Sequence, residues 1–332
     1  SAKGGATAMG PSARGYGEGA LSLGYQALAG ADVYGSGINV NNNPNDDNTN
    51  TINNYAKWGD AAIGLRAVAT GGNATALGRS ARAAAANAIA IGGGNGNSAT
   101  DNTEKTEATG EKATAIGYNA KAGAEKSTAI GASATANGLD SFAGASGTAS
   151  GAASVAIGKV SKATDSSATA VGDGTSALGQ GATALGSNAT AKNGFDLAVG
   201  RSVTSEGGAA TVVGYNSNVK GNQSTGMGSG INITSQKATG IGYQVNVSGD
   251  NAIGIGSSGD STFVTASGAS SIAMGTSAVA NQEKAIAIGA NSKGTDIGAT
   301  ALGRSSEATG ASATALGSLA SATGTTATAV GM

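Results

Sequence analysis

The chain contains 332 residues, of which 58 are glycine and 2 are proline, while aromatic residues make up 3% and charged residues 12%. Cysteine and histidine are both absent, which excludes a disulfide framework, thiolate or imidazole metal sites and catalysis by a histidine base. The 19 basic and 20 acidic residues balance, so the composition lacks the electrostatic footprint of a nucleic-acid-binding protein. No apolar run reaches the ~18 residues of a membrane-spanning helix.

An aliphatic residue followed by glycine recurs along the chain at a nearly constant spacing. We take the residue before the glycine as position 0 of each repeat. It occurs 21 times between Met9 and Val330, and 16 of the 20 intervals are 14 residues long. One interval, from Ile130 to Ala143, has 13 residues, and three longer intervals indicate insertions. A short fixed period predicts a solenoid, in which each repeat forms one coil stacked on its neighbours.

A unit of 14 residues is too short for two helices but can hold two strands of about five residues and two turns. One predicted strand runs into the glycine, as in residues 113–117, and the other follows it, as in residues 119–123. Glycines after position 0 and near position +8 would supply the turns. The sequence therefore predicts an all-β fold, a flattened parallel β-roll of about 21 coils. At one strand spacing of ~4.8 Å per coil, the roll would be a rod of about 100 Å.

Side chains along a strand alternate between two faces. Positions −2 and 0 of the first strand, and +4 and +6 of the second, carry no charged residue in any repeat, so we expect these columns to point inward. In one representative repeat they are Thr114, Ile116, Ala120 and Ala122. Position +5 is often charged, as at Lys121, and is expected to face solvent.

The other columns of the first strand, positions −3 and −1, are dominated by small residues. Position −1 is never charged, and position −3 is charged only at Asp60, Asp140 and Asp196. With positions −2 and 0 inside, this strip would lie on the outside of the roll. Either tight turns and close stacking require small residues there, or the strip packs against identical strips on sister chains and completes a poor core.

The repeats resemble the head of trimeric autotransporter adhesins, the YadA-like head, whose motif centres on Asn-Ser-Val-Ala-Ile-Gly-x-x-Ser or -Ala. The best copy runs from Ser154 to Ser161, with Ala153 where the motif has asparagine. The resemblance covers nearly all of residues 1–332 outside the insertions, and it implies one head domain, a left-handed, single-stranded parallel β-roll assembled as a homotrimer. It also implies a position at the cell surface of a Gram-negative bacterium, anchored through the outer membrane by parts outside this segment.

The resemblance further implies a non-enzymatic adhesin that attaches to host extracellular matrix or cells, or to other bacteria. In some members the motif is tied to collagen binding, which points here to Ser154, Val155, Ala156, Ile157, Gly158 and Ser161. Because Val155, Ile157 and Ser161 fall in columns expected to be buried, a structural role for the motif is the competing interpretation. The alternative function is a spacer rod that projects another binding module and has no ligand of its own.

The insertions lie near residues 30–58, 93–110 and 257–267. The first contains Tyr34, Tyr55, Lys57 and Trp58, which is the only tryptophan. Loops carry function in repeat proteins, so we expect these four residues either to contact a ligand or to hold the loop down in a small satellite cluster. The expected partners are two sister chains and a host matrix protein or cell-surface receptor, with no nucleic acid and no membrane insertion by this segment.

Other motifs are weaker than the period that contains them. Residues 254–259 match a dinucleotide-binding glycine pattern, but no helix pattern follows to hold a pyrophosphate. Residues 41–50 are rich in oxygen ligands, yet a calcium loop read from Asp46 has neither the central glycine nor the final glutamate. We therefore expect no metal and no cofactor, and the scattered carboxylates disfavour an enzyme.

Overall fold

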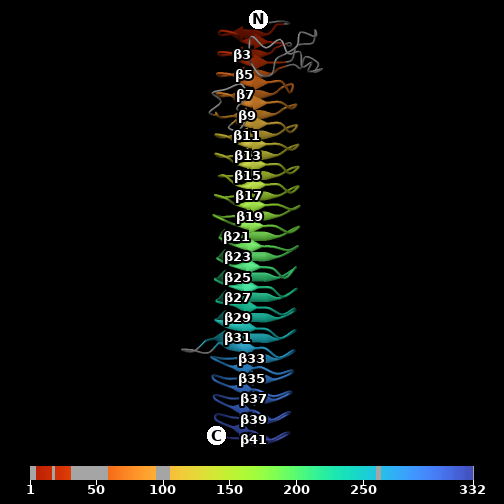
Figure 1. Cartoon of the computed structure of the whole chain (residues 1–332), viewed down its shortest axis with the longest axis vertical. Coiled ribbons are helices and arrows are strands. Elements are labelled where there is room, and N and C mark those ends of the chain that lie inside the picture. Colours follow the sequence, from red (N-terminus) through yellow and green to blue (C-terminus); the bar gives the residue numbers. More distant parts are fainter. Residues whose placement is uncertain (1–4, 17–18, 31–58, 95–104, 259–262, 332) are drawn as a thin grey trace. The chain divides into compact units, whose positions relative to one another are not determined.

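The structure is a computed structural model of the whole chain and describes residues 5–16, 19–30, 59–94, 105–258 and 263–331. The described residues form β-strands joined by turns and contain no helix. They divide into two compact units, Ser1–Val171 and Gly172–Met332. In each unit the odd-numbered strands form one parallel sheet and the even-numbered strands form another (Figure 1), and we call these the odd sheet and the even sheet.

The odd sheet of the first unit contains β1 (Thr7–Met9), β3 (Leu21–Leu23), β5 (Ala61–Ile63), β7 (Thr75–Leu77), β9 (Ile89–Ile91), β11 (Thr114–Ile116), β13 (Thr128–Ile130), β15 (Phe142–Gly144), β17 (Val155–Ile157) and β19 (Thr169–Val171). Its even sheet contains β2 (Arg14–Gly15), β4 (Leu28–Ala29), β6 (Val68–Ala69), β8 (Arg82–Ala83), β10 (Glu107–Ala108), β12 (Lys121–Ala122), β14 (Thr135–Ala136), β16 (Thr148–Ala149) and β18 (Lys162–Ala163).

The odd sheet of the second unit contains β21 (Thr183–Ser187), β23 (Leu197–Arg201), β25 (Thr211–Tyr215), β27 (Thr225–Ser229), β29 (Thr239–Tyr243), β31 (Ile253–Ser257), β33 (Ile272–Met274), β35 (Ile286–Ile288), β37 (Thr300–Leu302), β39 (Thr314–Leu316) and β41 (Thr328–Val330). Its even sheet contains β20 (Ser176–Ala177), β22 (Thr190–Ala191), β24 (Thr204–Ser205), β26 (Asn218–Val219), β28 (Asn232–Ile233), β30 (Val245–Val247), β32 (Val264–Ala266), β34 (Val279–Ala280), β36 (Lys293–Gly294), β38 (Glu307–Ala308) and β40 (Ser321–Ala322).

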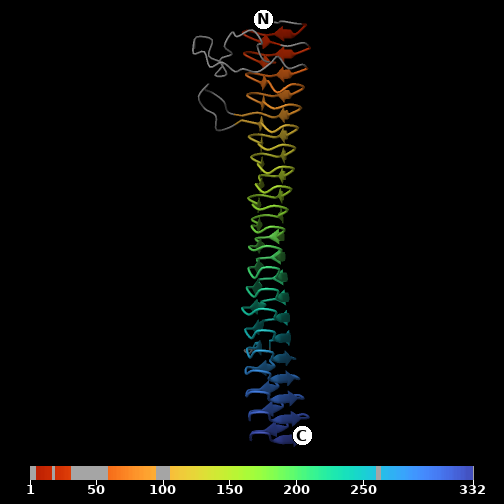
Figure 2. The ribbon, with the colours of Figure 1, turned by 90° about the vertical axis from the view of Figure 1, so that its right-hand side faces the viewer.

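Each strand pairs in parallel with the equivalent strand of the next coil. Thr114 pairs with Thr128 in the odd sheet, and Lys121 pairs with Thr135 in the even sheet, so the chain returns to the same position after 14 residues. The predicted parallel β-solenoid is therefore confirmed, and Figure 2 shows the coils from the side. The strands are mostly shorter than expected, with three residues in β11 and two in β12, although β21 to β31 of the odd sheet have five.

The glycine after position 0 is required by the close approach of successive coils. Gly64 and Gly117 have φ angles of +132° and +128°, a region that favours glycine. A Cβ atom at Gly64 would lie 2.6 Å from the carbonyl oxygen of Gly78, and one at Gly117 would lie 2.7 Å from that of Gly131. The aliphatic–glycine pair recurs because the turn of each coil lies directly on the turn of the next.

The prediction of which residues of the first strand point inward is wrong. Ala113 and Ala115, at positions −3 and −1, are fully buried, whereas Thr114 and Ile116, at positions −2 and 0, lie partly exposed on the outer face. The interior between two closely packed sheets accepts methyl-sized side chains, and the larger aliphatic ones are directed outward. The small-residue strip therefore belongs to the core of each coil and does not face sister chains.

The prediction for the second strand is confirmed, because Ala120 and Ala122, at positions +4 and +6, are fully buried. Alanines from both strands pack together, as in the cluster that includes Ala299, Ala301 and Ala308. The core of each coil is therefore a thin layer of alanine between the two sheets.

The predicted position 0 at Ala143 is displaced by one residue. Gly144 pairs with Ile130 in the sheet, so Gly144 occupies position 0 and Ala143 occupies position −1. The missing residue of that coil therefore follows β15 and does not precede it. Asp140 then lies at position −4, in an exposed turn with a φ of 54°, and the buried residue at position −3 is Ser141.

Two carboxylates remain at position −3, and both are buried. Asp60 Oδ1 accepts the backbone N–H groups of Gly72 at 2.9 Å and Ala74 at 2.8 Å. In an ordinary coil the equivalent N–H, that of Ala113, is donated to the carbonyl of Gly110 at 3.1 Å. The coil after Asp60 has two successive glycines, at residues 71–72, and the carboxylate binds the amide groups of this altered turn.

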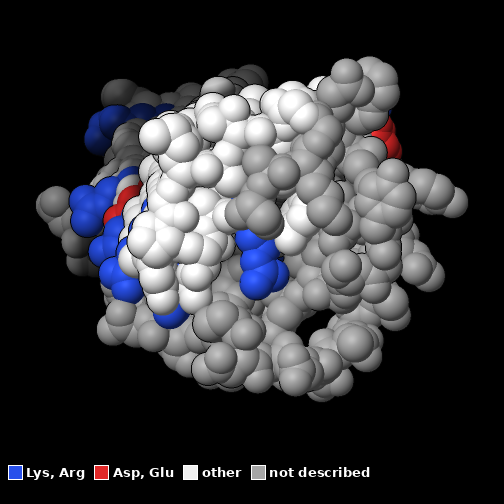
Figure 3. All heavy atoms as spheres, turned by 90° about the horizontal axis from the view of Figure 1, so that it is seen from above, with Lys and Arg blue, Asp and Glu red and all other residues white. Residues whose placement is uncertain are grey.

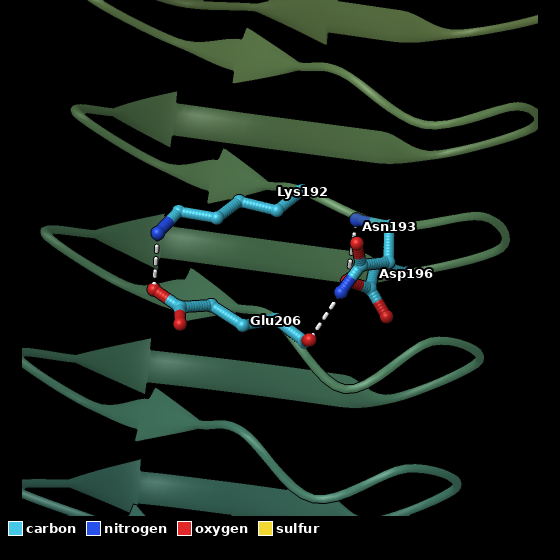
Figure 4. Close-up of polar contacts among 4 residues, drawn as sticks. All are labelled: Lys192, Asn193, Asp196 and Glu206. Carbon is cyan, nitrogen blue, oxygen red and sulfur yellow. Dashed lines mark hydrogen bonds and ion pairs between the residues drawn. The ribbon is translucent and has the colours of Figure 1, made fainter.

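Asp196 binds one N–H group of the next coil and one of its own turn in the second unit (Figure 4). Its Oδ1 accepts the N–H of Ala210 at 3.0 Å, and its Oδ2 accepts the N–H of Asn193 at 3.0 Å. The following coil again has two successive glycines, at residues 207–208. Buried N–H groups without partners are costly, so a carboxylate is tolerated in the alanine core where it binds them.

Replacing Asp196 with alanine is expected to lower the free energy of unfolding by about 2 kcal/mol, because two N–H groups lose their acceptor. Asp196→Asn, which keeps one acceptor oxygen, should cost less. Asp173→Ala is the matched control, since this aspartate is exposed in the same unit and its replacement should change stability by less than about 0.5 kcal/mol. Urea denaturation followed by circular dichroism measures all three. Equal stability of the Asp196→Ala and Asp173→Ala variants would contradict the proposed role.

Some coils of the second unit have larger side chains in the core, and glycine on the facing strand compensates for their volume. Ile231 and Ile233 occupy positions +4 and +6 of one coil, and position −1 of the next coil is Gly240 instead of alanine. Val245 and Val247 are followed in the same way by Gly254, at which a Cβ atom would lie 2.8 Å from Val245 Cγ1 and 2.9 Å from Val247 Cγ2. Space taken by larger side chains on one sheet is released by glycine on the other.

Gly254→Ala is therefore expected to destabilise the protein by about 1–3 kcal/mol through overpacking. Adding Val245→Ala and Val247→Ala restores the alanine pattern of other coils and should recover part of this loss. Denaturation of the single, double and triple variants gives the coupling between the two sheets. Additive effects of the glycine and valine substitutions would refute volume exchange.

Candidate interaction surface

The outer face of the odd sheet carries the side chains at positions −2 and 0, and we call it the aliphatic face. In the first unit its position-0 residues are Met9, Leu23, Ile63, Leu77, Ile91, Ile116, Ile130, Gly144, Ile157 and Val171. In the second unit they are Leu185, Val199, Val213, Met227, Ile241, Ile255, Met274, Ile288, Leu302, Leu316 and Val330. Parallel pairing in register places the side chains of each unit in one continuous row.

These side chains are substantially open to solvent. Leu77 is 41% exposed and Ile130 42% in the first unit, and Met227 is 46% and Leu302 40% in the second. Position −2 adds threonine or further aliphatic residues, such as Ile89, which is 37% exposed. No residue at position −2 or 0 is charged. Long uncharged apolar surfaces are rare on monomers and mark interaction sites.

The structure separates the residues of the predicted binding motif. Val155 is partly exposed and Ile157 is 37% exposed on the aliphatic face, so the prediction that they point inward is wrong. They lie on the same face as the residues at positions −2 and 0 of the remaining coils. Gly158 follows them with a φ of +128°, in the turn that stacks on the next coil.

The remaining motif residues lie inside. Ala156 is fully buried, and Ser154 and Ser161 are buried with their hydroxyl groups donating to the carbonyl oxygens of Gly151 at 2.7 Å and Gly158 at 3.0 Å. The prediction that Ser161 points inward is confirmed. These serines close turns, so only Val155 and Ile157 offer side chains to a partner.

Tyr34, Tyr55, Lys57 and Trp58 lie outside the described residues, as do parts of all three insertions. The flanks of the insertions are described. Gly30 and Gly59 border the first, after the even sheet, whereas the second and third follow Gly94 and Ser258, in turns that lead from the odd sheet to the even sheet.

The charge pattern of the sequence does not predict the aliphatic face. Absence of charge does not by itself indicate burial here, because both faces of this strand are almost free of charge. Side-chain size was the available signal, because isoleucine, leucine and methionine at position 0 are much larger than the alanines in every confirmed interior column.

The outer face of the even sheet is polar and carries ion pairs between successive coils. Lys293 Nζ lies 2.8 Å from Glu307 Oε1, Arg82 contacts Glu107 at 3.8 Å, and Lys192 contacts Glu206 (Figure 4). Exposed pairs of this kind contribute little to stability. This face is thus solvated, as predicted for position +5.

Further ion pairs lie in the turn that leads from the even sheet back to the odd sheet. A hydrogen bond and charge attraction from Glu111 raise the pKa of Lys112, and Glu283 raises that of Lys284 in the same way. Both lysines therefore stay charged at neutral pH. The described residues contain no cluster of three or more acidic side chains able to hold a metal ion, and no helix in this part of the chain could cross a membrane.

Comparison with known families agrees with the geometry. The YadA head domain repeat (2 copies) matches stretches that together cover more than half of the chain. They are residues 62–95, 108–134, 122–143, 149–175, 177–202, 266–292, 297–320 and 308–332. No curated protein matches it. The family is one of bacterial cell-surface adhesins and not of enzymes. The chain belongs to the YadA head domain family of trimeric autotransporter adhesins.

Proposed function

We propose that residues 1–332 are one head segment of a homotrimeric adhesin on the surface of a Gram-negative bacterium, anchored through the outer membrane by parts outside this segment. The head would attach the cell to host extracellular matrix or cells, or to other bacteria. The aliphatic face is the observation that supports the proposal, because it is an extended apolar surface that a single chain leaves exposed. The alternative is a spacer rod that projects another module.

The energetics favour association through the aliphatic face. Burying the exposed part of one aliphatic side chain contributes about 1 kcal/mol, so the nine aliphatic residues at position 0 of the first unit could together contribute on the order of 10 kcal/mol. This gain is comparable with the ~4–15 kcal/mol cost of lost rigid-body freedom. A few coils would therefore bind weakly, and an extended row is needed for a stable assembly.

Assembly through this face decides between the two interpretations of the motif. Val155 and Ile157 cannot contact both sister chains and matrix, because they lie within the aliphatic row, between β15 and β19. We infer that the motif residues serve trimer packing and turn closure. The candidate ligand contacts then remain Tyr34, Tyr55, Lys57 and Trp58 of the first insertion, which three chains would present in three copies, raising avidity.

The purified chain is expected to have a mass near three times 31.1 kDa by light scattering. Ile130→Asp together with Ile157→Asp should convert it to monomer, because charge is placed in an apolar interface. Thr135→Asp with Thr148→Asp is the matched control on the outer face of the even sheet and should leave the mass unchanged. A trimer that survives the first pair, with both variants folded by circular dichroism, would contradict the interface.

Replacing Tyr34, Tyr55 and Trp58 with alanine is expected to weaken attachment to collagen-coated surfaces or cultured cells at least tenfold, since aromatic anchors dominate binding energy. Tyr215→Ala with Tyr243→Ala is the control, because these tyrosines lie 50% exposed at strand ends in the second unit. Attachment that is unchanged by the loop substitutions would favour a repeat-face contact. A head that attaches to none of these surfaces would favour the spacer.

A further inference from the structure

Charges are segregated across the first unit. Among its described residues, the turn from the odd to the even sheet and the outer face of the even sheet carry eight basic side chains and one acidic side chain, Glu107. We call this surface the cationic face; its basic residues are Arg14, Arg66, Arg79, Arg82, Lys105, Lys121, Lys159 and Lys162. Figure 3 looks at the molecule end-on and shows several Lys and Arg side chains on one side, with an acidic side chain next to them.

The opposite turn has the reverse balance. Between the even and the odd sheet lie Glu111, Glu125, Asp140 and Asp165, with Lys112 and Lys126 as the only basic residues described there. The positive charges of the two lysines are compensated by ion pairs, because Lys112 Nζ is 3.0 Å from Glu111 and Lys126 Nζ is 3.3 Å from Glu125. Apart from Glu107 and the buried Asp60, the acidic groups described in this unit thus lie on the side away from the cationic face.

The centre of the cationic face is formed by Lys121, Lys159 and Lys162. No described carboxylate lies within ion-pair distance of these three. Glu107 is the neighbour of Lys121 in the sheet register, but it is paired with Arg82 on its other side. Lys159 is in the turn before β18 and Lys162 is in β18, which is three strands from Lys121 in β12. That separation is about 14 Å, so the charges follow the stacking direction and do not converge on one point.

The same surface of the second unit has a smaller excess. Its described residues there include five basic and three acidic side chains, and Lys192 and Lys293 are paired with Glu206 and Glu307. The segregation therefore does not follow from the repeat, which is common to both units. It is a property of the particular residues of the first unit.

We propose that the cationic face binds a sulfated polysaccharide chain lying along the even sheet. A small anion would meet one lysine at a time, whereas an extended polyanion neutralises several together. Thr135 and Thr148 lie between Lys121 and Lys162 in the same column and can hydrogen-bond sugar hydroxyl groups. Duplex DNA, with one charge per ~1.7 Å, is much denser than this row of cations.

The inference rests on the proposed adhesin function, for which it names a ligand class. It does not require the aliphatic face, which lies on the other sheet. A homotrimer packed through the odd sheets would leave the even sheets available and present three cationic faces.

The test measures binding of the full chain to immobilised heparin, with Lys121→Gln, Lys159→Gln and Lys162→Gln combined. We expect at least tenfold weaker binding and earlier elution in salt. Lys220→Gln, Lys237→Gln and Arg304→Gln, in the second unit, remove the same net charge and should change affinity less than twofold. Desulfated heparin should bind the unaltered chain at least tenfold more weakly.

Equal losses in the two triple variants would overturn the proposal, because binding would then follow net charge alone. Equal binding of heparin and a short DNA duplex, with the same dependence on the three lysines, would also overturn it in favour of a general polyanion surface. Attachment to collagen or cells is measured in parallel. A head that attaches to these but not to heparin refutes the polysaccharide site and leaves the adhesin function standing, whereas the reverse result refutes attachment to those surfaces.

Discussion

The narrow space between the two sheets governs the structure. Each coil contributes only two side chains from each strand to the interior, and most are alanine or serine because the space is narrow. At Ile231 and at Val245, glycine on the facing strand makes room for the larger side chain. The aliphatic residues of the repeat are consequently directed outward, and the surface that a single coil cannot bury becomes available for assembly.

A thin core requires stabilisation from elsewhere, and much of it comes from the ordered backbone. Every coil pairs with the next through two parallel ladders, so stability accumulates from neighbour to neighbour. Polar side chains enter the interior where they close turns. Ser154 and Ser161 donate to carbonyl groups, and Asp60 and Asp196 accept amide groups beside double glycines. The buried polar residues are thus part of the stacking and do not form a chemical site.

The function of such a scaffold lies on its surfaces. The odd sheet presents aliphatic rows, and the even sheet of the first unit presents lysines that have no ion pair among the described residues, with most of the described acidic side chains in the opposite turn. Strand alternation separates each outer surface from the core, since successive residues of a strand point to the core and to the exterior in turn. Each outer surface can therefore vary without disturbing the alanine interior.

The amino-acid sequence by itself determined the 14-residue coil, the parallel stacking and the interior columns at Ala120 and Ala122, because glycine spacing and alternation of charge with alanine are local features. It left the first strand ambiguous, since Thr114 and Ile116 are uncharged and so are Ala113 and Ala115. Charge could not distinguish a buried face from an aliphatic face made for contact. Only the tertiary structure decided this, because the distance between the sheets sets the side-chain size that fits, and that distance depends on both strands packed together.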